Sequence, residues 1–156
     1  MEKQAKSVTD ISIESLCRHG IEGILLDLDN TIVAWGEDHI AYDMRRWIQK
    51  GKAHGLRFCL LSNSYTDRAR RIAGDLRIPV IAPALKPLPF GYMRAMNLLG
   101  INAKHTVMIG DQLFTDILGA HFLKINTISV TPLSKQTSGQ RAFLAAWNDS
   151  FGNEGE

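Results

Sequence analysis

Acidic, basic and hydroxyl side chains stand directly after short apolar runs, where they can converge on one site. They are four aspartates, one lysine and one serine: Asp27, Asp29, Ser62, Lys86, Asp111 and Asp116. Several carboxylates beside a single ammonium repel one another in a partly desolvated cleft, and a divalent cation relieves that repulsion. Hard oxygen ligands without a histidine or cysteine cluster favour Mg²⁺. The pattern therefore predicts a magnesium site.

Each of these pieces has an ordinary structural interpretation when it is taken alone. Asp29-Asn30 fits a turn after a strand, and residues 62–64 fit a loop with a helix cap. Lys86-Pro87 fits a solvated lysine before a rigid turn, and Gly110-Asp111 fits a common turn between a strand and a helix. Because each piece follows a successive apolar run, their order favours one shared site over a series of coincidences.

Five apolar runs predict the strands that position these residues. The runs cover residues 23–28, 57–61, 79–81, 106–109 and 126–130. Helical segments alternate with them, at 42–54, from Ser64 or Thr66 to Leu76, at 89–99, at 113–122 and at about 138–151. This alternation predicts an α/β fold, a Rossmann-like, doubly wound, mostly parallel five-stranded sheet with helices on both faces. Ligands bind at the carboxyl ends of such strands, so we expect the polar residues to meet at one edge.

Length and composition restrict the class of protein. The chain has 156 residues, of which 45% are hydrophobic and 22% charged, so we expect one domain over 1–156 with its core at about 11–133. The net charge of +2 is too small to indicate nucleic-acid binding. No apolar run is long enough to span a membrane, and the N-terminal segment lacks the apolar stretch of a signal peptide. We therefore expect a cytoplasmic protein.

Four segments resemble the four motifs of the haloacid dehalogenase (HAD) superfamily of phosphohydrolases. They are DLDNT at 27–31, Ser62, Lys86-Pro87 and GDQLFTD at 110–116. The longer stretches GIEGILLDLDNTIVAW, LLSNS, LKPL and IGDQLFTDILGA are similar to the YqeG-type family of subclass IIIA. The resemblance runs from about Ile11 to Leu133, and it implies a HAD fold and a hydrolase that acts on phosphoric monoesters.

The resemblance also implies a covalent mechanism with Mg²⁺. Asp27 resembles the nucleophile that forms an aspartyl-phosphate, and Asp29 resembles the general acid that protonates the leaving oxygen and then activates water. We expect neighbouring carboxylates to crowd Asp29 and make it a usable acid. The implied metal ligands are Asp27, the backbone carbonyl of Asp29, and Asp111. Asp116 is expected to bind the metal, directly or through water, or to orient Lys86.

Phosphate-binding residues are implied in the same way. We expect Ser62, Asn63 and Lys86 to hold the phosphoryl group, with Lys86 neutralising its charge and that of the nucleophile. A helix that starts just after Ser62 is expected to direct backbone N–H groups at the phosphate.

The spacing of the motifs argues against a separate cap domain. Asp29 and Ser62 are 33 positions apart, and Ser62 and Lys86 are 24 positions apart. Each interval must hold a helix and a strand, whereas an independent domain needs about 50 residues or more. We therefore expect an open site that accepts a large phosphorylated substrate or is closed by a second copy of the chain in a homodimer. Trp35 fits either contact with that substrate or packing on the fold.

Two other functions stay open. One is a phosphatidylglycerophosphate phosphatase at the membrane surface, since relatives of that kind are similar at the acids, Asn30 and Lys86, although they differ at Leu28 and Thr31. The other is a regulatory binding module that keeps the HAD fold but works through partners.

Two further groups of residues bear on these alternatives. The basic residues Arg68, Arg70 and Arg71 fit contact with an anionic headgroup, but a solvated helix face is the favoured interpretation. An apolar stripe near the C-terminus fits core packing first and a dimer or membrane contact second. It consists of Phe143, Leu144, Trp147 and Phe151.

Overall fold

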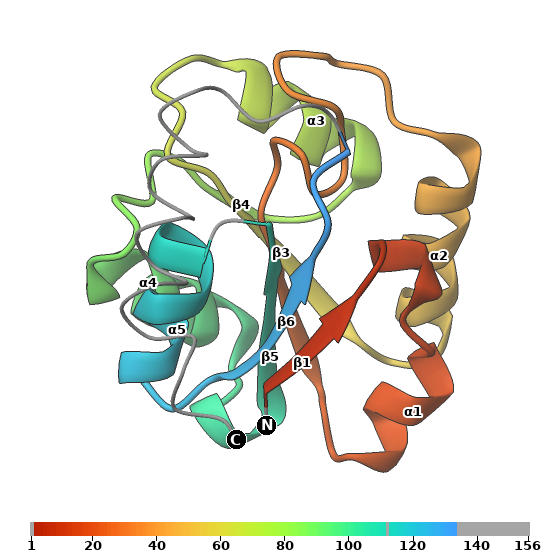
Figure 1. Cartoon of the computed structure of the whole chain (residues 1–156), viewed down its shortest axis with the longest axis vertical. Coiled ribbons are helices and arrows are strands. Elements are labelled where there is room, and N and C mark those ends of the chain that lie inside the picture. Colours follow the sequence, from red (N-terminus) through yellow and green to blue (C-terminus); the bar gives the residue numbers. More distant parts are fainter. Residues whose placement is uncertain (1, 112, 134–156) are drawn as a thin grey trace.

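A single parallel sheet organises the molecule. The computed structural model describes residues 2–111 and 113–133 (Figure 1). The strands are β1 (Glu2–Ala5), β2 (Gly23–Leu26), β3 (Arg57–Leu61), β4 (Val80–Ile81), β5 (Thr106–Gly110) and β6 (Asn126–Val130). They pair in the order β1-β6-β5-β2-β3-β4, and every neighbouring pair is parallel. All five predicted strands are therefore present in a doubly wound sheet.

The expectation of five strands is wrong by one, because β1 adds a sixth at the edge of the sheet. Glu2 pairs with Thr127 and Ala5 with Val130. The strand has the sequence EKQA, and its Lys3 and Gln4 side chains are exposed. A polar edge strand of this kind carries no apolar run, so hydrophobic patterning does not reveal it.

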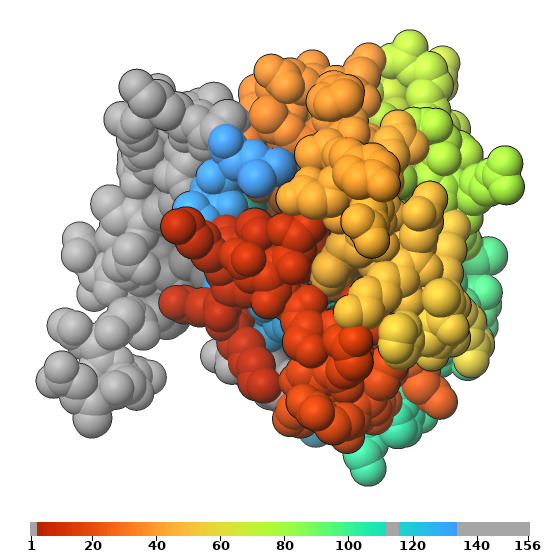
Figure 2. Space-filling model, turned by 90° about the vertical axis from the view of Figure 1, so that its right-hand side faces the viewer, coloured from red at the N-terminus to blue at the C-terminus, as the bar shows by residue number. Residues whose placement is uncertain are grey.

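Helices cover both faces of the sheet, as the alternating pattern predicts (Figure 1). On one face lie α1 (Ile13–Arg18), α2 (Tyr42–Ala53) and α3 (Arg68–Leu76), which pack with inward side chains of β2, β3, β5 and β6. On the other face lie α4 (Pro89–Leu99) and the short α5 (Gly119–Phe122), which follows a π-helical turn at Leu113–Leu118. Figure 2 shows the N-terminal segment and α2 side by side on the first face.

Helix α2 illustrates how the sequence fixes this packing. Met44, Trp47 and Ile48 are buried at helical spacing and face the sheet. The Trp47 ring meets Phe58 of β3 edge to face at 5.8 Å between centroids. A Cβ atom at Gly51 would lie 2.5 Å from the Phe58 ring, so this helical turn needs glycine to approach the strand.

Helix α3 begins later than the sequence predicts, and this corrects the expectation of a helix N-terminus just after Ser62. Its first residue is Arg68, and neither Ser64 nor Thr66 caps it. Instead the Ser64 hydroxyl accepts a hydrogen bond from the Thr66 backbone N–H at 3.2 Å, and the two hydroxyls lie 2.8 Å apart. These local bonds hold a turn between β3 and α3, as serine and threonine often do outside helices.

The chain order places β2 at the point where the winding of the sheet reverses. From β2 the chain proceeds to β3 and β4 on one side, then crosses back through α4 to β5 on the other side. Loops that follow β2, β3 and β5 therefore meet at one edge, which is where α/β sheets bind ligands. Between the motifs the structure has only α2 and β3, then α3 and β4, so no cap domain interrupts the described chain.

The predicted C-terminal helix at 138–151 and its apolar stripe lie outside the described residues. Among the described residues, no helix has the length and apolar character needed to cross a membrane.

Candidate active site

Lys86 forms the centre of a buried ion-pair cluster at this edge of the sheet. Its ammonium donates to Asp27 Oδ1 at 2.7 Å and to Asp116 Oδ1, and the Lys86 side chain is only 2% exposed. Burial alone would lower the pKa of Lys86, but the charges of Asp116 and Asp27 outweigh burial and raise it. Lys86 is therefore a permanent cation against Asp27.

A third carboxylate makes the cluster rich in negative charge. Ligand oxygens of Asp27, Asp111 and Asp116 all lie within 4.8 Å of one another, and all three residues are buried. Burial, followed by the charge of Asp27 and a hydrogen bond with it, raises the pKa of Asp111 to about 9. The Thr31 hydroxyl lies 3.4 Å from Asp27 Oδ2 and 3.5 Å from Asp111 Oδ1. This set of hard oxygens fits a divalent cation.

Gly110 and Tyr92 hold Asp116 in place, a role that the sequence interpretation did not assign to either residue. A Cβ atom at Gly110 would lie 2.4 Å from Asp116 Oδ2, so the end of β5 must be glycine for this carboxylate to approach. The buried Tyr92 hydroxyl of α4 donates to the Asp116 backbone carbonyl at 3.2 Å. Gly110 belongs to the fourth motif, and this position is the feature of the sequence from which its role could have been predicted.

Asp29 is not part of the acid cluster formed by Asp27, Asp111 and Asp116. This corrects the expectation that neighbouring carboxylates crowd Asp29. Its Oδ1 accepts hydrogen bonds from Arg68 Nη1 at 2.7 Å and from the Gly36 backbone N–H at 3.1 Å. The expected solvated face for Arg68 is also wrong, because its side chain is only 14% exposed. Arg70 and Arg71 are exposed, as the interpretation of a solvated helix face predicts.

Ser62 and Asn63 stand at the end of β3, next to Lys86. The Asn63 amide donates to the Lys86 backbone carbonyl at 3.0 Å and accepts from the Lys86 backbone N–H at 2.8 Å. Asn63 thus holds the Lys86 backbone, a contact that the sequence interpretation did not foresee. The buried Ser62 hydroxyl accepts from the Ser64 backbone N–H at 3.1 Å.

One pocket, with a volume of about 320 Å³, lies beside Lys86. Its lining consists of Asp27, Asp29, Trp35, Ser62, Asn63, Ser64 and Lys86. The volume is that of a small-molecule site, and Trp35 forms part of its wall while staying 48% exposed. Six of these seven residues belong to the segments in which the sequence predicted chemistry.

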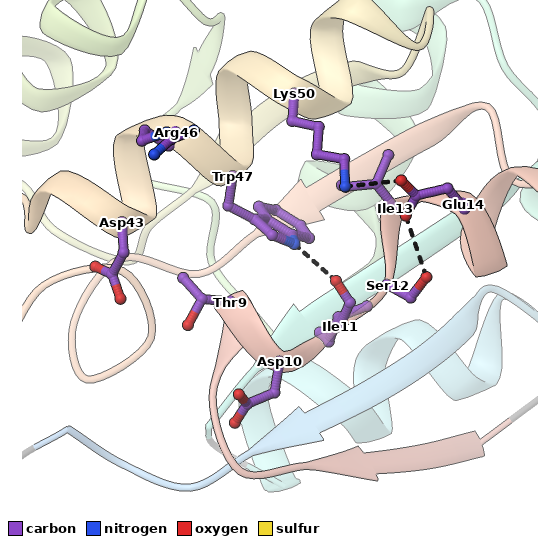
Figure 3. A pocket seen from close by; sticks show the side chains of 10 residues that line it. All are labelled: Thr9, Asp10, Ile11, Ser12, Ile13, Glu14, Asp43, Arg46, Trp47 and Lys50. Carbon is purple, nitrogen blue, oxygen red and sulfur yellow. Dashed lines mark hydrogen bonds and ion pairs between the residues drawn. The ribbon is translucent and has the colours of Figure 1, made fainter.

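A second pocket, of about 520 Å³, lies between the N-terminal segment and α2 (Figure 3). Some of its polar groups are engaged with one another. Lys50 pairs with Glu14 at 2.7 Å, and the Trp47 indole N–H donates to the Ile11 carbonyl at 2.8 Å. It contains none of the residues that follow β2, β3 or β5, so the pocket that holds Lys86 is the candidate active site.

Comparison with known proteins identifies the family. The chain is 33% identical over 129 residues to the probable phosphatase YqeG of Bacillus subtilis strain 168, an alignment that covers 83% of this chain and 75% of the relative. The chain belongs to the YqeG-type family of HAD-superfamily phosphatases. A family profile described as HAD-hydrolase-like matches residues 83–138 of this HAD chain. The resemblance seen in the motifs is confirmed.

Solved structures agree with the HAD fold. The cobalt-bound deoxy-D-mannose-octulosonate 8-phosphate phosphatase of Haemophilus influenzae superimposes with a TM-score of 0.58 at 17% identity, covering 86% of this chain and 91% of that one. An uncharacterised protein of Listeria monocytogenes serotype 4b gives a TM-score of 0.57 at 20% identity, covering 75% of this chain and 85% of that one. At these identities the likeness concerns the fold.

Proposed function

We propose that the chain is a Mg²⁺-dependent phosphatase that hydrolyses a phosphomonoester through an aspartyl-phosphate on Asp27. The observation that carries this proposal is the buried contact between Lys86 and Asp27 at the pocket, with two further carboxylates beside it. Asp27, Asp111 and Asp116, with the backbone carbonyl of Asp29, would hold the ion. When bound, Mg²⁺ supplies positive charge to the transferring oxygens and to the crowded carboxylates.

The first half of the reaction transfers the phosphoryl group to the protein. An Asp27 carboxylate oxygen forms a bond to phosphorus while the bond between phosphorus and the leaving oxygen breaks. Asp29 gives its proton to that leaving oxygen, so the product alcohol departs neutral. Lys86 neutralises charge at Asp27 and at the phosphoryl oxygens. The Ser62 hydroxyl, which lines the same pocket, would donate to the phosphoryl oxygens.

The second half returns the enzyme to its starting state. Asp29, now a carboxylate, takes a proton from water as the water oxygen attacks phosphorus. The bond between phosphorus and the Asp27 oxygen breaks, which releases inorganic phosphate and restores the Asp27 carboxylate. Asn63 supports both halves by fixing the backbone that carries Lys86.

Phosphate release from an aryl phosphate tests the proposal. We expect turnover with Mg²⁺, none with EDTA, and none from Asp27→Asn with Mg²⁺. Asp43→Asn is the matched control, because Asp43 lines the second pocket and lies outside the proposed site. Turnover by Asp27→Asn at the wild-type rate would refute the covalent mechanism. Stable co-purification of a partner with no turnover across a broad phosphate panel would favour the regulatory module instead.

A lipid phosphomonoester is the second candidate substrate, because exposed apolar side chains flank Lys86. Leu85, Leu88 and Phe90 are 46%, 52% and 64% exposed. Exposed apolar side chains next to Lys86 in the sequence suit a phosphate presented at a lipid surface. Parallel assays with phosphatidylglycerophosphate in mixed micelles and with soluble sugar phosphates distinguish the two substrate classes. A cytoplasmic location, a single domain and a homodimer stay predictions from the sequence.

A further inference from the structure

Arg68 connects the proposed general acid to the loop that follows it. At the start of α3, its guanidinium donates through Nη1 to Asp29 at 2.7 Å and through Nε to Asp38 at 2.8 Å. Nη2 donates to the Glu37 carbonyl. One side chain thus joins three points of the 29–38 segment to a helix of the core. A guanidinium presents its donors in a fixed planar fork, so it can define the geometry of all three acceptors at once.

Both contacts of the Asp29 carboxylate fall on the same oxygen. Arg68 Nη1 and the Gly36 N–H each donate to Oδ1, and no hydrogen bond to Oδ2 is found among the described residues. A proton held between Asp29 and a substrate oxygen therefore belongs on Oδ2, since Oδ1 already accepts two donors. By donating to Oδ1, Arg68 determines that Oδ2 is the oxygen left to carry the proton.

The same contacts fix one wall of the pocket. Trp35 lines the pocket together with Asp29. Its backbone N–H donates to Asn30 Oδ1 at 3.2 Å, and the next residue, Gly36, donates to Asp29. Arg68 holds residues 37 and 38 immediately beyond. Release of Arg68 would therefore loosen Trp35 and Asp29 together.

We propose that Arg68 is a positioning residue that orients Asp29, through Oδ1, so that Oδ2 exchanges the proton with the leaving oxygen. This inference rests on the phosphatase function proposed above. Arg68 touches neither the acid cluster nor Lys86, so it acts on the leaving-group side of the reaction. Its removal should slow formation of the aspartyl-phosphate only where the leaving oxygen needs a proton.

Leaving-group dependence gives a test that a merely structural role would fail. We compare wild type and Arg68→Ala on butyl phosphate, whose alkoxide must be protonated, and on dinitrophenyl phosphate, whose phenolate departs unaided. We expect kcat/KM, which reports the first half of the reaction, to fall for butyl phosphate by about tenfold to a hundredfold, as for a partial loss of general acid catalysis. For dinitrophenyl phosphate we expect a change of less than about threefold. Equal losses on both esters would overturn the inference and leave the phosphatase function intact.

Two variants serve as controls. Arg71→Ala removes a neighbouring arginine of the same helix that lies 3.6 Å from Asp38 and 68% exposed, and we expect it to match wild type on both esters. Arg68→Lys keeps the charge but not the fork, so we expect partial recovery on butyl phosphate. A wild type that hydrolyses neither ester would refute the proposed function itself, and the role of Arg68 with it.

Hydrogen exchange gives a readout that does not depend on turnover. Loss of Arg68 should speed amide exchange in residues 34–39, including the Gly36 N–H that donates to Asp29. Exchange in α2 should stay at the wild-type rate. Unchanged exchange at 34–39 in Arg68→Ala would overturn the proposed link between Arg68 and the pocket wall.

Discussion

Lys86 stands between two carboxylates that are buried together with it. Its side chain is 2% exposed, and those of Asp27 and Asp116 are 10% and 0% exposed. Each charge helps to offset the desolvation of the others, so the loss of one member leaves buried charge uncompensated. This explains why a residue that looks like a surface lysine in the sequence is part of the interior.

Removal of this ammonium should destabilise the metal-free protein. We expect Lys86→Met to lower the free energy of unfolding by about 3–5 kcal/mol, because the carboxylates lose their buried counter-ion. Urea denaturation in the presence of EDTA measures this free energy of unfolding. Lys50→Met is the matched control, since Lys50 pairs with Glu14 at the surface with about half of each side chain exposed, and we expect little change there. Similar losses in the two variants would contradict the buried ion-pair account.

At the scale of elements, the end of β5 and the π-helical turn after it must approach each other closely. Gly110 allows this approach, because any side chain at this position would meet the Asp116 carboxylate and the atoms that carry it. The position of Asp116 against Lys86 therefore depends on a strand residue with no catalytic group of its own.

A methyl group at Gly110 should disturb both stability and activity. We expect Gly110→Ala to lower the free energy of unfolding by about 1–3 kcal/mol, because it overpacks a buried contact, and to reduce phosphate release. Gly74→Ala is the control, since a Cβ there meets nothing within 4 Å. That variant should gain about 0.5–1 kcal/mol, because alanine is favoured in a helix. Chemical denaturation measures the stability of the two variants, and the aryl phosphate assay measures their activity. Full activity in Gly110→Ala would contradict the close approach of β5 to Asp116.

Elements with strong apolar runs are predictable from the sequence, and weakly patterned ones are not. The runs predicted five strands because inner parallel strands are buried on both faces, as in β2, where every residue is buried. The polar strand β1 and the late start of α3 were not predicted. An exposed edge strand and a turn held by hydroxyl groups have no periodic pattern of apolar residues. In the pocket, strand ends predicted Asp27, Ser62 and Lys86, whereas the Arg68 contact depends on a fold of residues 29–38 that no spacing encodes.

For the molecule as a whole, we expect the buried carboxylates of Asp27, Asp111 and Asp116 to couple folding to pH and to metal binding. The native protein keeps a proton on Asp111 that the unfolded chain has already lost, because the native pKa is raised. Stability of the metal-free protein from this group therefore falls as the pH rises from the ordinary aspartate range toward about 9. A divalent cation held by Asp111 would displace that proton, so we expect its binding to tighten over the same pH range.

Thermal denaturation with and without Mg²⁺ tests this coupling. We expect the gain in melting temperature on adding Mg²⁺ to be larger at about pH 8.5 than at about pH 5.5, because proton release accompanies binding. Asp111→Asn removes the titrating group, so it should lose both the gain and its dependence on pH. An equal gain at the two pH values in the wild type would show that the ion binds elsewhere.

The pairing of β1 with β6 has a consequence for how the chain reaches its final form. Glu2 and Thr127 are partners in the sheet although nearly the whole described sequence separates them. During synthesis on the ribosome β1 therefore has no partner in this sheet until the residues of β6 have been made. Closure of this edge brings together the most distant segments of the described chain, and such contacts form slowly.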